Sequence, residues 1–195
     1  MPSIDTDEKT SRFTARLQRP AVADAQSGSA FVVLPREASA ILARRGRTTV
    51  RGTLNGQAFQ ATLEPDGQLS HWLPIGDALL RAAGVQAGDT AAFEIAAVDQ
   101  EPEPPLPPEF EAALSQAPAA SAVWQATTTI ARVDWIHWIT SAKQARTRAQ
   151  RIRNAVDMLA SGKRRVCCFD PSGYYSKALS APKAADGPVE RAPQR

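Results

Sequence analysis

Three residues of one predicted helix have the side-chain types of a hydrolytic triad. Asp134, His137 and Ser141 recur at steps of three and four residues, and this spacing places their side chains in line on one face of a helix. In an enzyme such a set would perform acyl transfer, with the serine as nucleophile and the histidine as its general base. A catalytic serine normally stands on a strained turn beside backbone donors that hold the oxyanion, and a serine within a helix has neither. We therefore expect a solvent-facing polar strip with a weak surface pair between the aspartate and the histidine, and we assign no catalytic residue.

A histidine and two glycines in the first half of the chain could line a ligand pocket. His71 precedes Trp72 in a short predicted strand, and Gly52 and Gly56 belong to a predicted hairpin. If these strands form the mouth of a barrel, the four residues could surround a small ligand or a substrate. The favoured interpretation of His71 and Trp72 is nevertheless an ordinary pair of strand residues.

The two cysteines of the chain, Cys167 and Cys168, are neighbours. Adjacent cysteines cannot build a disulfide framework and lack the ligand spacing of a zinc site. Because neighbouring Cβ vectors usually diverge, we expect two reduced thiols rather than a redox pair or half of an intermolecular metal site. The sequence also lacks the glycine-rich fingerprints of phosphate and dinucleotide binding, so it predicts no cofactor and no metal site.

Basic residues gather in the second half of the chain. Thirteen basic and nine acidic residues follow position 100, whereas the first hundred residues hold ten basic and eleven acidic ones. In this half, residues 145–160 predict a helix with a five-residue apolar stripe bordered by arginines. The stripe consists of Ala145, Ala149, Ile152, Val156 and Leu159. Arginine stems commonly lie over the edge of a core with solvated heads, so we expect mainly a solvated face.

Alternating and turn-forming residues predict the elements of the first half. Residues 13–17 alternate between apolar and polar side chains, and two further alternating runs, 48–54 and 57–64, flank Asn55-Gly56. Asparagine followed by glycine suits a type I′ hairpin turn, because both central residues need a positive φ. Five or six short strands with one helix late in the series predict a small antiparallel β-barrel, whose closure would remove exposed sheet edges.

The predicted fold class is α+β, with an N-terminal small antiparallel β-barrel followed by a C-terminal α-helical domain. The chain should contain a barrel, a proline-rich linker, a helical domain and a mostly disordered tail, at residues 12–99, 100–108, 109–165 and 166–195. Two long helices, 129–143 and 145–160, should dominate the helical domain, and the first should be largely buried. At the start of the tail, Phe169, Tyr174 and Tyr175 could lie against the helical domain.

The sequence predicts a cytoplasmic protein without a membrane span. No apolar run approaches the roughly 18 residues that a membrane-spanning helix needs. The first ten residues, MPSIDTDEKT, lack the positive start and the apolar middle of a signal peptide.

A distributed pattern in the two long helices resembles a known bacterial family. The pattern WI..AK...TR..RI is formed by Trp138, Ile139, Ala142, Lys143, Thr147, Arg148, Arg151 and Ile152. It is similar to the core motif of the YdeI/OmpD-associated family, also called bacteriocin-protection proteins. Upstream, Phe31 to Pro35, Gly52 to Gly56 and Ala82 to Val85 resemble the small β-barrel domain of unknown function that often precedes the motif.

The resemblance implies a non-enzymatic binding or stress-protection module with a protein partner of unknown identity, and it brings no catalytic residues. Two alternatives remain open. The first is nucleic-acid binding through the arginine-bordered helix, although zinc-finger spacing, RNA-binding aromatic motifs and phosphate-clamping loops are absent from the sequence. The second is a small-ligand-binding protein or an enzyme that uses the barrel mouth or the domain cleft.

Five motif residues are the candidates for a functional surface, and we expect them to serve structure first and recognition second. They are Trp138, Lys143, Thr147, Arg148 and Arg151. Arg148 should have a partly buried stem and a guanidinium group that needs acceptors. Carbonyl groups at the end of the preceding helix, or a carboxylate from the barrel, could accept its hydrogen bonds.

Overall fold

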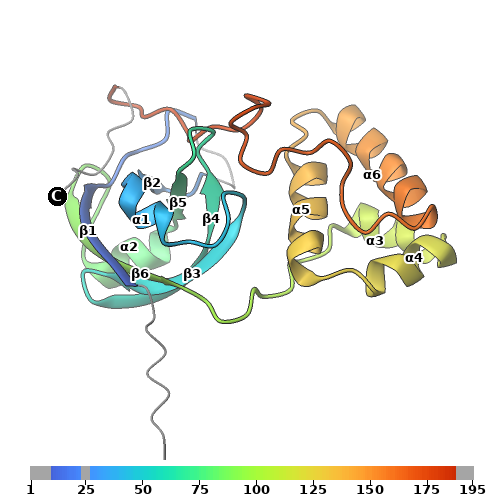
Figure 1. The fold of residues 1–195 in the computed structure, drawn as a ribbon. Helices are drawn as coiled ribbons and strands as arrows, with labels where there is room; N and C mark the ends of the chain where they lie inside the picture. The colour runs from blue at the N-terminus through green and yellow to red at the C-terminus, as the bar shows by residue number, and fades with distance from the viewer. Residues whose placement is uncertain (1–9, 23–26, 188–195) are drawn as a thin grey trace, which may run out of the picture. The chain divides into compact units, whose positions relative to one another are not determined.

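The computed structural model describes residues 10–22 and 27–187, and the chain divides into two compact units. The first unit combines Met1–Asp99 with Ser172–Arg195, and the second is Gln100–Pro171. Figure 1 shows strands in the first unit and helices in the second, as the predicted α+β class requires.

In its described residues, the first unit is a six-stranded antiparallel half-barrel (Figure 1). The strands are β1 Thr10–Arg16, β2 Ala30–Val33, β3 Thr48–Leu54, β4 Gln57–Pro65, β5 His71–Ile75 and β6 Thr90–Ala97, in the spatial order β1-β6-β3-β4-β5-β2. Two short helices accompany them, α1 Arg36–Ala40 and α2 Asp77–Ala83. The apolar side chains of the alternating strand residues share one core on the concave face, which includes Val50, Leu63 and Ile95.

The two strands at the ends of the sheet order meet beyond β1. The backbone N–H of Gln18 donates to the carbonyl of Phe31 at 2.8 Å, and the N–H of Phe31 donates back to Gln18 at 2.8 Å. Since Phe31 lies in β2, this bridge brings the continuation of β1 against the opposite edge strand. An edge strand that finds such a partner presents fewer unpaired backbone groups to other chains.

The Asn55-Gly56 turn is the confirmed hairpin, and it also fastens β6. Asn55 has φ 48° and Gly56 has φ 82°, so both central residues take the positive φ that the turn requires. The side-chain oxygen of Asn55 accepts from the Ala92 N–H at 2.8 Å, and the Asn55 N–H donates to the Ala92 carbonyl at 2.8 Å. The asparagine therefore contributes more than its tolerance of the left-handed conformation.

Gly52 allows β3 and β6 to approach each other. It pairs with Phe59 on one side and with Ile95 on the other. A Cβ atom at this position would lie 1.9 Å from the carbonyl oxygen of Glu94, far inside van der Waals contact. The absence of a side chain is thus a packing requirement here, and its cause differs from that at Gly56.

The segment 172–187, predicted as part of a mostly disordered tail, lies with the half-barrel unit in the structure. The Ala21 N–H donates to the Lys183 carbonyl, and the Ala185 N–H donates to the Arg19 carbonyl, both at 2.8 Å. Ala184 also packs against a small apolar cluster of the sheet. The last residues of the predicted tail, 188–195, lie outside the described residues.

The second unit contains four helices in its described residues (Figure 1). They are α3 Pro108–Ser115, α4 Pro118–Gln125, α5 Thr129–Thr140 and α6 Ala145–Ala160. Prolines occupy the first positions of α3 and α4, where their missing N–H would have no helical partner. The side chain of Thr128 caps α5 by accepting from the Ala131 N–H at 3.3 Å. As predicted, α5 is largely covered, with six of its twelve residues buried and five more half-buried.

The predicted apolar stripe of α6 faces the core of the helical unit only in its C-terminal part, at Ile152, Val156 and Leu159. Ile152, Ala155 and Leu159 are buried, whereas Ala145 and Ala149 are exposed. A run of small alanines gives little guidance about which side of a helix is covered, because alanine has little apolar surface to bury. The larger side chains determine which face of α6 is buried.

Among the helices of residues 10–22 and 27–187, none has the length and apolar character that a membrane span requires.

The two hairpin glycines should respond differently to substitution. Gly56→Val should lower the free energy of unfolding by about 1–2 kcal/mol, because a β-branched residue resists positive φ. Gly52→Ala adds a single carbon but should cost about 3 kcal/mol, since the obstructing atom belongs to the backbone of β6. Chemical denaturation of both variants measures the difference. A Gly52→Ala variant as stable as the parent protein would contradict the close approach of the two strands.

Candidate functional sites

Asp134 and His137 of α5 do not form a solvent-facing strip with Ser141, the residue that follows this helix. His137 is 2% exposed, and its ring stands edge-on to Phe169 at 5.4 Å between centroids. Asp134 and Ser141 are half-buried. The expected surface strip is therefore wrong for the histidine, because the segment after α6 returns over this face of α5. Sequence periodicity cannot show a covering segment that lies 32 positions further along.

Arg151 of α6 holds the C-terminal end of α5. Its Nη1 donates to the carbonyl of Trp138 and to the Oγ of Ser141, the latter at 3.0 Å. The guanidinium carbon lies 5.4 Å from the centre of the Trp138 ring, a cation–π distance. The last carbonyls of a helix have no intrahelical partner and carry the negative end of its dipole. Arg151 supplies both a donor and a positive charge at that point.

Arg132 of α5 holds the end of α4 in the same way. Its Nη2 donates to the carbonyl of Gln125 at 2.9 Å and its Nε to that of Trp124 at 3.3 Å, while its guanidinium lies 5.7 Å from the Trp124 ring centre. Glu103 pairs with its Nη1 at 2.9 Å. Two successive helix ends are thus each closed by an arginine of the next helix that stacks on a tryptophan of the end it closes. The sequence shows both residue types but not this pairing.

The structure divides the five candidate motif residues into two groups. Trp138 and Arg151 make the contact described above, whereas Lys143 and Thr147 are exposed. Arg148 is half-buried and lies on the line of Ile152, Ala155 and Leu159, at the end of that row. The acceptors expected for Arg148 at the end of the preceding helix are those that Arg151 uses. Arg151 comes three residues after Arg148, so its side chain points about 60° away from that of Arg148 around the helix axis, toward α5. This difference in direction explains why Arg151, and not Arg148, reaches the acceptors.

His71 forms a buried polar contact in the half-barrel. Both His71 and Ser39 are 0% exposed, and the Ser39 Oγ lies 2.7 Å from Nδ1 of the histidine. The other ring nitrogen, Nε2, lies 3.0 Å from the carbonyl of Gly46. A carbonyl can only accept, so Nε2 carries the proton and Nδ1 accepts from the serine hydroxyl. This serine–histidine pair joins β5 to α1 and to the loop before β3, and its burial suits a structural role.

Burial lowers the pKa of His71 below its usual value. The hydrogen bond to Gly46 opposes that shift, and the positive charges of Arg45 and Arg44 add to it, while Asp66 acts against it. The histidine is therefore neutral at pH 7, as its two hydrogen bonds require.

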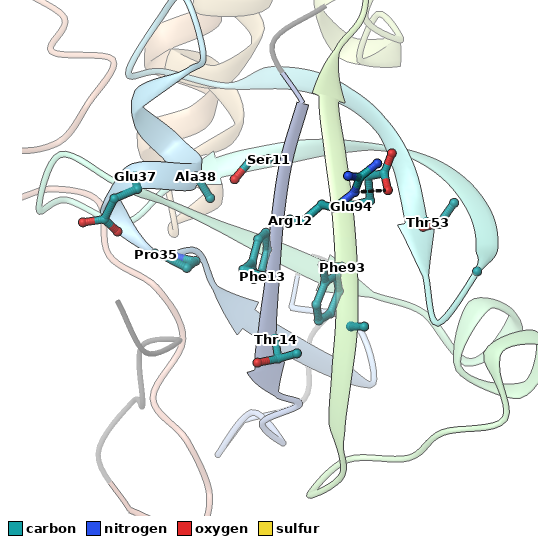
Figure 2. Close-up of a pocket in the computed structure, with 12 residues that line it drawn as sticks. Ser11, Arg12, Phe13, Thr14, Pro35, Glu37, Ala38, Thr53, Phe93 and Glu94 are labelled. Carbon is teal, nitrogen blue, oxygen red and sulfur yellow. Dashed lines mark hydrogen bonds and ion pairs between the residues drawn. The ribbon is translucent and has the colours of Figure 1, made fainter. Parts of the chain in front are cut away.

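A cavity of about 380 Å³ lies in the half-barrel unit, lined by residues of β1, α1, β3, β6 and the hairpin turn. Figure 2 shows Phe13 and Phe93 next to each other on neighbouring strands, and their rings are stacked at 5.1 Å. The Arg12–Glu94 pair, 2.7 Å apart, lies beside them. The volume is within the range of small-molecule pockets, and the stacked rings give it a flat apolar wall.

Sequence reasoning identified only part of this cavity. Gly56 is among its lining residues, while Gly52, His71 and Trp72 are not. The sequence predicts Phe13 only as an apolar residue of an alternating strand. The juxtaposition of Phe13 and Phe93 follows from the β1–β6 register, in which the two residues pair directly, and no local signal reveals a pairing across 80 positions.

Two family models match the chain. Residues 103–162 match the family described as bacteriocin-protection, YdeI or OmpD-associated. Residues 13–95 match a domain of unknown function, DUF1905. The two matches follow each other in the order that the resemblance predicts. No curated protein matches the chain.

Lysine substitutions at Arg151 and Arg148 should differ in their effect on the free energy of unfolding, because only Arg151 closes the end of α5. Arg151→Lys should lower the free energy of unfolding by about 1 kcal/mol, because an ammonium group cannot keep both acceptors and the stacked geometry over Trp138. Arg153→Lys is the matched control, since its guanidinium bonds to the exposed side chain of Gln150. Urea denaturation measures all three variants. An equal loss of unfolding free energy in Arg148→Lys and Arg151→Lys would contradict the assignment of Arg151 as the arginine that closes the end of α5.

The stability of the chain should carry a pH dependence that comes from His71. Its pKa is lowered by folding, so the unfolded chain takes up the proton first when the pH falls below about 6.5. The stabilising contribution is complete above that pH and decreases as the pH falls, by at most about 1.4 kcal/mol per pH unit. Denaturation curves between pH 7.5 and 5 should show this slope in the parent protein and a smaller slope in His71→Gln. Identical slopes would contradict the buried neutral state.

Proposed function

We propose that this chain is a non-enzymatic binding protein of bacterial stress protection, because residues 103–162 match the model of the bacteriocin-protection, YdeI or OmpD-associated family and follow a match to DUF1905. In this proposal the helical unit recognises a protein partner with an acidic surface. The protein acts in the cytoplasm, and its half-barrel unit has a supporting role.

The observation that carries the proposal is the different use of the motif residues. Trp138 and Arg151 contact each other inside the helical unit, through a hydrogen bond to the Trp138 carbonyl and through the guanidinium over the Trp138 ring. Lys143 and Thr147, from the same motif, are exposed, and neighbouring Arg146 is exposed as well. A motif that served folding alone would have no use for a lysine and a threonine in these outward positions.

The charge of this region gives the partner's chemistry. Residues 143–165 contain eight basic side chains and a single carboxylate, Asp157. In the described part of the chain, Lys143, Arg146 and Arg148 form no ion pair with a carboxylate. Complementary charge at the rim of an interface accelerates association and suppresses wrong partners. A partner with clustered carboxylates fits this surface.

Affinity capture with the full chain tests the proposal. The immobilised parent protein should retain a reproducible protein partner from a lysate of the organism that encodes it. The double variant Lys143→Glu with Arg146→Glu should retain at least about tenfold less, because reversing rim charges slows association. Arg81→Glu is the matched control, since Arg81 is an exposed arginine of α2 in the other unit, and it should retain as much as the parent protein.

Two outcomes would overturn the proposal. Recovery of no protein at several salt concentrations would refute the existence of a protein partner. Equal recovery by both charge variants would refute binding through the surface that contains Lys143 and Arg146. Capture of RNA or DNA with affinity that falls steeply as salt rises would support the nucleic-acid alternative instead.

A further inference from the structure

The two cysteines form a convergent pair on the surface of the helical unit. Cys167 and Cys168 are both exposed, and their sulfur atoms are 3.3 Å apart. The expected divergence of the two side chains is therefore wrong. Cys168 has φ 59°, the left-handed conformation, and this local turn of the backbone directs both side chains to the same side.

Contacts on both sides of the pair fix its position. On the N-terminal side, Trp135 Nε1 donates to the carbonyl of Arg164 at 3.3 Å, and Val166 packs against the core of the helical unit. On the C-terminal side, Phe169 stands edge-on to the buried His137. A two-residue segment between such anchors has few conformations available, so the sulfur atoms stay close without a covalent bond.

Positive charge near the pair and the hydrogen bond between the two thiols act on the pKa of Cys168 in opposite directions. Lys163, Arg164 and Arg165 lie two to four residues before Cys167, and positive neighbours promote thiolate formation. The hydrogen bond with Cys167 raises the pKa of the Cys168 thiol, and the charge of Lys163 acts against that shift. The pair therefore offers two neighbouring thiols that are both exposed to solvent.

We propose that Cys167 and Cys168 together chelate trivalent arsenic, as arsenite or as an organic arsenical. Thiolates are the soft ligands that soft metal and metalloid centres prefer. Trivalent arsenic is pyramidal and holds two sulfur atoms at nearly a right angle, so its ligands must converge from one side. The sulfur atoms of this pair converge in that way.

The separation of the sulfur atoms distinguishes this ligand from the alternatives. A disulfide requires sulfur atoms about 2.05 Å apart, so it would have to draw the 3.3 Å pair together inside a small ring. A two-coordinate linear ion would require the sulfur atoms on opposite sides of the metal. A bent two-thiolate centre needs neither change.

The reaction exchanges ligands and oxidises nothing. When arsenous acid binds, two As–S bonds form and two As–OH bonds break, and the two thiol protons leave with the hydroxide groups as two molecules of water. With phenylarsine oxide, two As–S bonds replace the As–O unit, whose oxygen leaves with both protons as one molecule of water. Arsenic stays trivalent throughout.

Phenylarsine oxide added to the reduced full chain tests the proposal. Intact-mass spectrometry should show one adduct per chain with the loss of one water, and thiol titration should show that both thiols are consumed. Excess glutathione, a monothiol, should not remove the adduct, whereas dithiothreitol, a dithiol, should. Cys167→Ser and Cys168→Ser should each release the arsenical at least about 100-fold more readily, because the second sulfur then no longer acts as an intramolecular ligand.

Comparable retention by either single variant, or an adduct that leaves one thiol free, would overturn the chelate. Phe169→Ala tests the anchoring, since it loosens the segment and leaves both thiols in place. It should release the arsenical several-fold faster while its thiols still react with a monofunctional reagent. An unchanged rate of arsenical release would overturn the claim that the contact of Phe169 keeps the two sulfur atoms close together.

Discussion

The helical unit depends on how the open ends of its helices are closed. Each helix ends with carbonyl groups that lack an intrahelical partner, and burying such an end without donors is costly. Arg132 closes the end of α4 and Arg151 closes the end of α5, each while stacked on a tryptophan of the helix it closes. One side chain thus satisfies the carbonyls, complements the helix dipole and covers an aromatic face.

This arrangement explains why a single motif can mix structure with recognition. Arg151 can reach the end of α5 only if α6 begins a short distance after it, and that connection contains Lys143. Thr147 then falls in the first turn of α6, on the outer side of the helix. The contact that stabilises the unit therefore determines which motif residues reach solvent. The same return of the chain carries residues 163–169 back over α5, where Phe169 covers His137 and the two cysteines lie between anchored neighbours.

The half-barrel depends on the close approach of the backbones of β3 and β6, as the helical unit depends on its closed helix ends. Gly52 lets β3 and β6 come together, and Asn55 joins the hairpin turn to β6. Residues of β1, β6 and α1 line the cavity together, and the stacked Phe13 and Phe93 form a wall of it. His71, buried and neutral, then links β5 to Ser39 of α1. The Ser39 hydroxyl and the Gly46 carbonyl satisfy both of its ring nitrogens inside the core.

The sequence by itself determined the elements whose signals are local. The Asn55-Gly56 turn, the alternating strands, the buried character of α5 and the α+β order all follow from residues within a few positions of one another. The tertiary structure decided the contacts between distant residues: Phe13 with Phe93, Arg151 rather than Arg148 at the end of α5, Phe169 over His137, and residues 172–187 beside the half-barrel. The physical reason is that periodicity reports which face of an element is apolar, whereas the segment that covers it depends on packing across the whole unit. For the same reason the cysteine pair could be read as two separate thiols from the sequence, and only the anchored backbone on either side of it shows that the sulfur atoms converge.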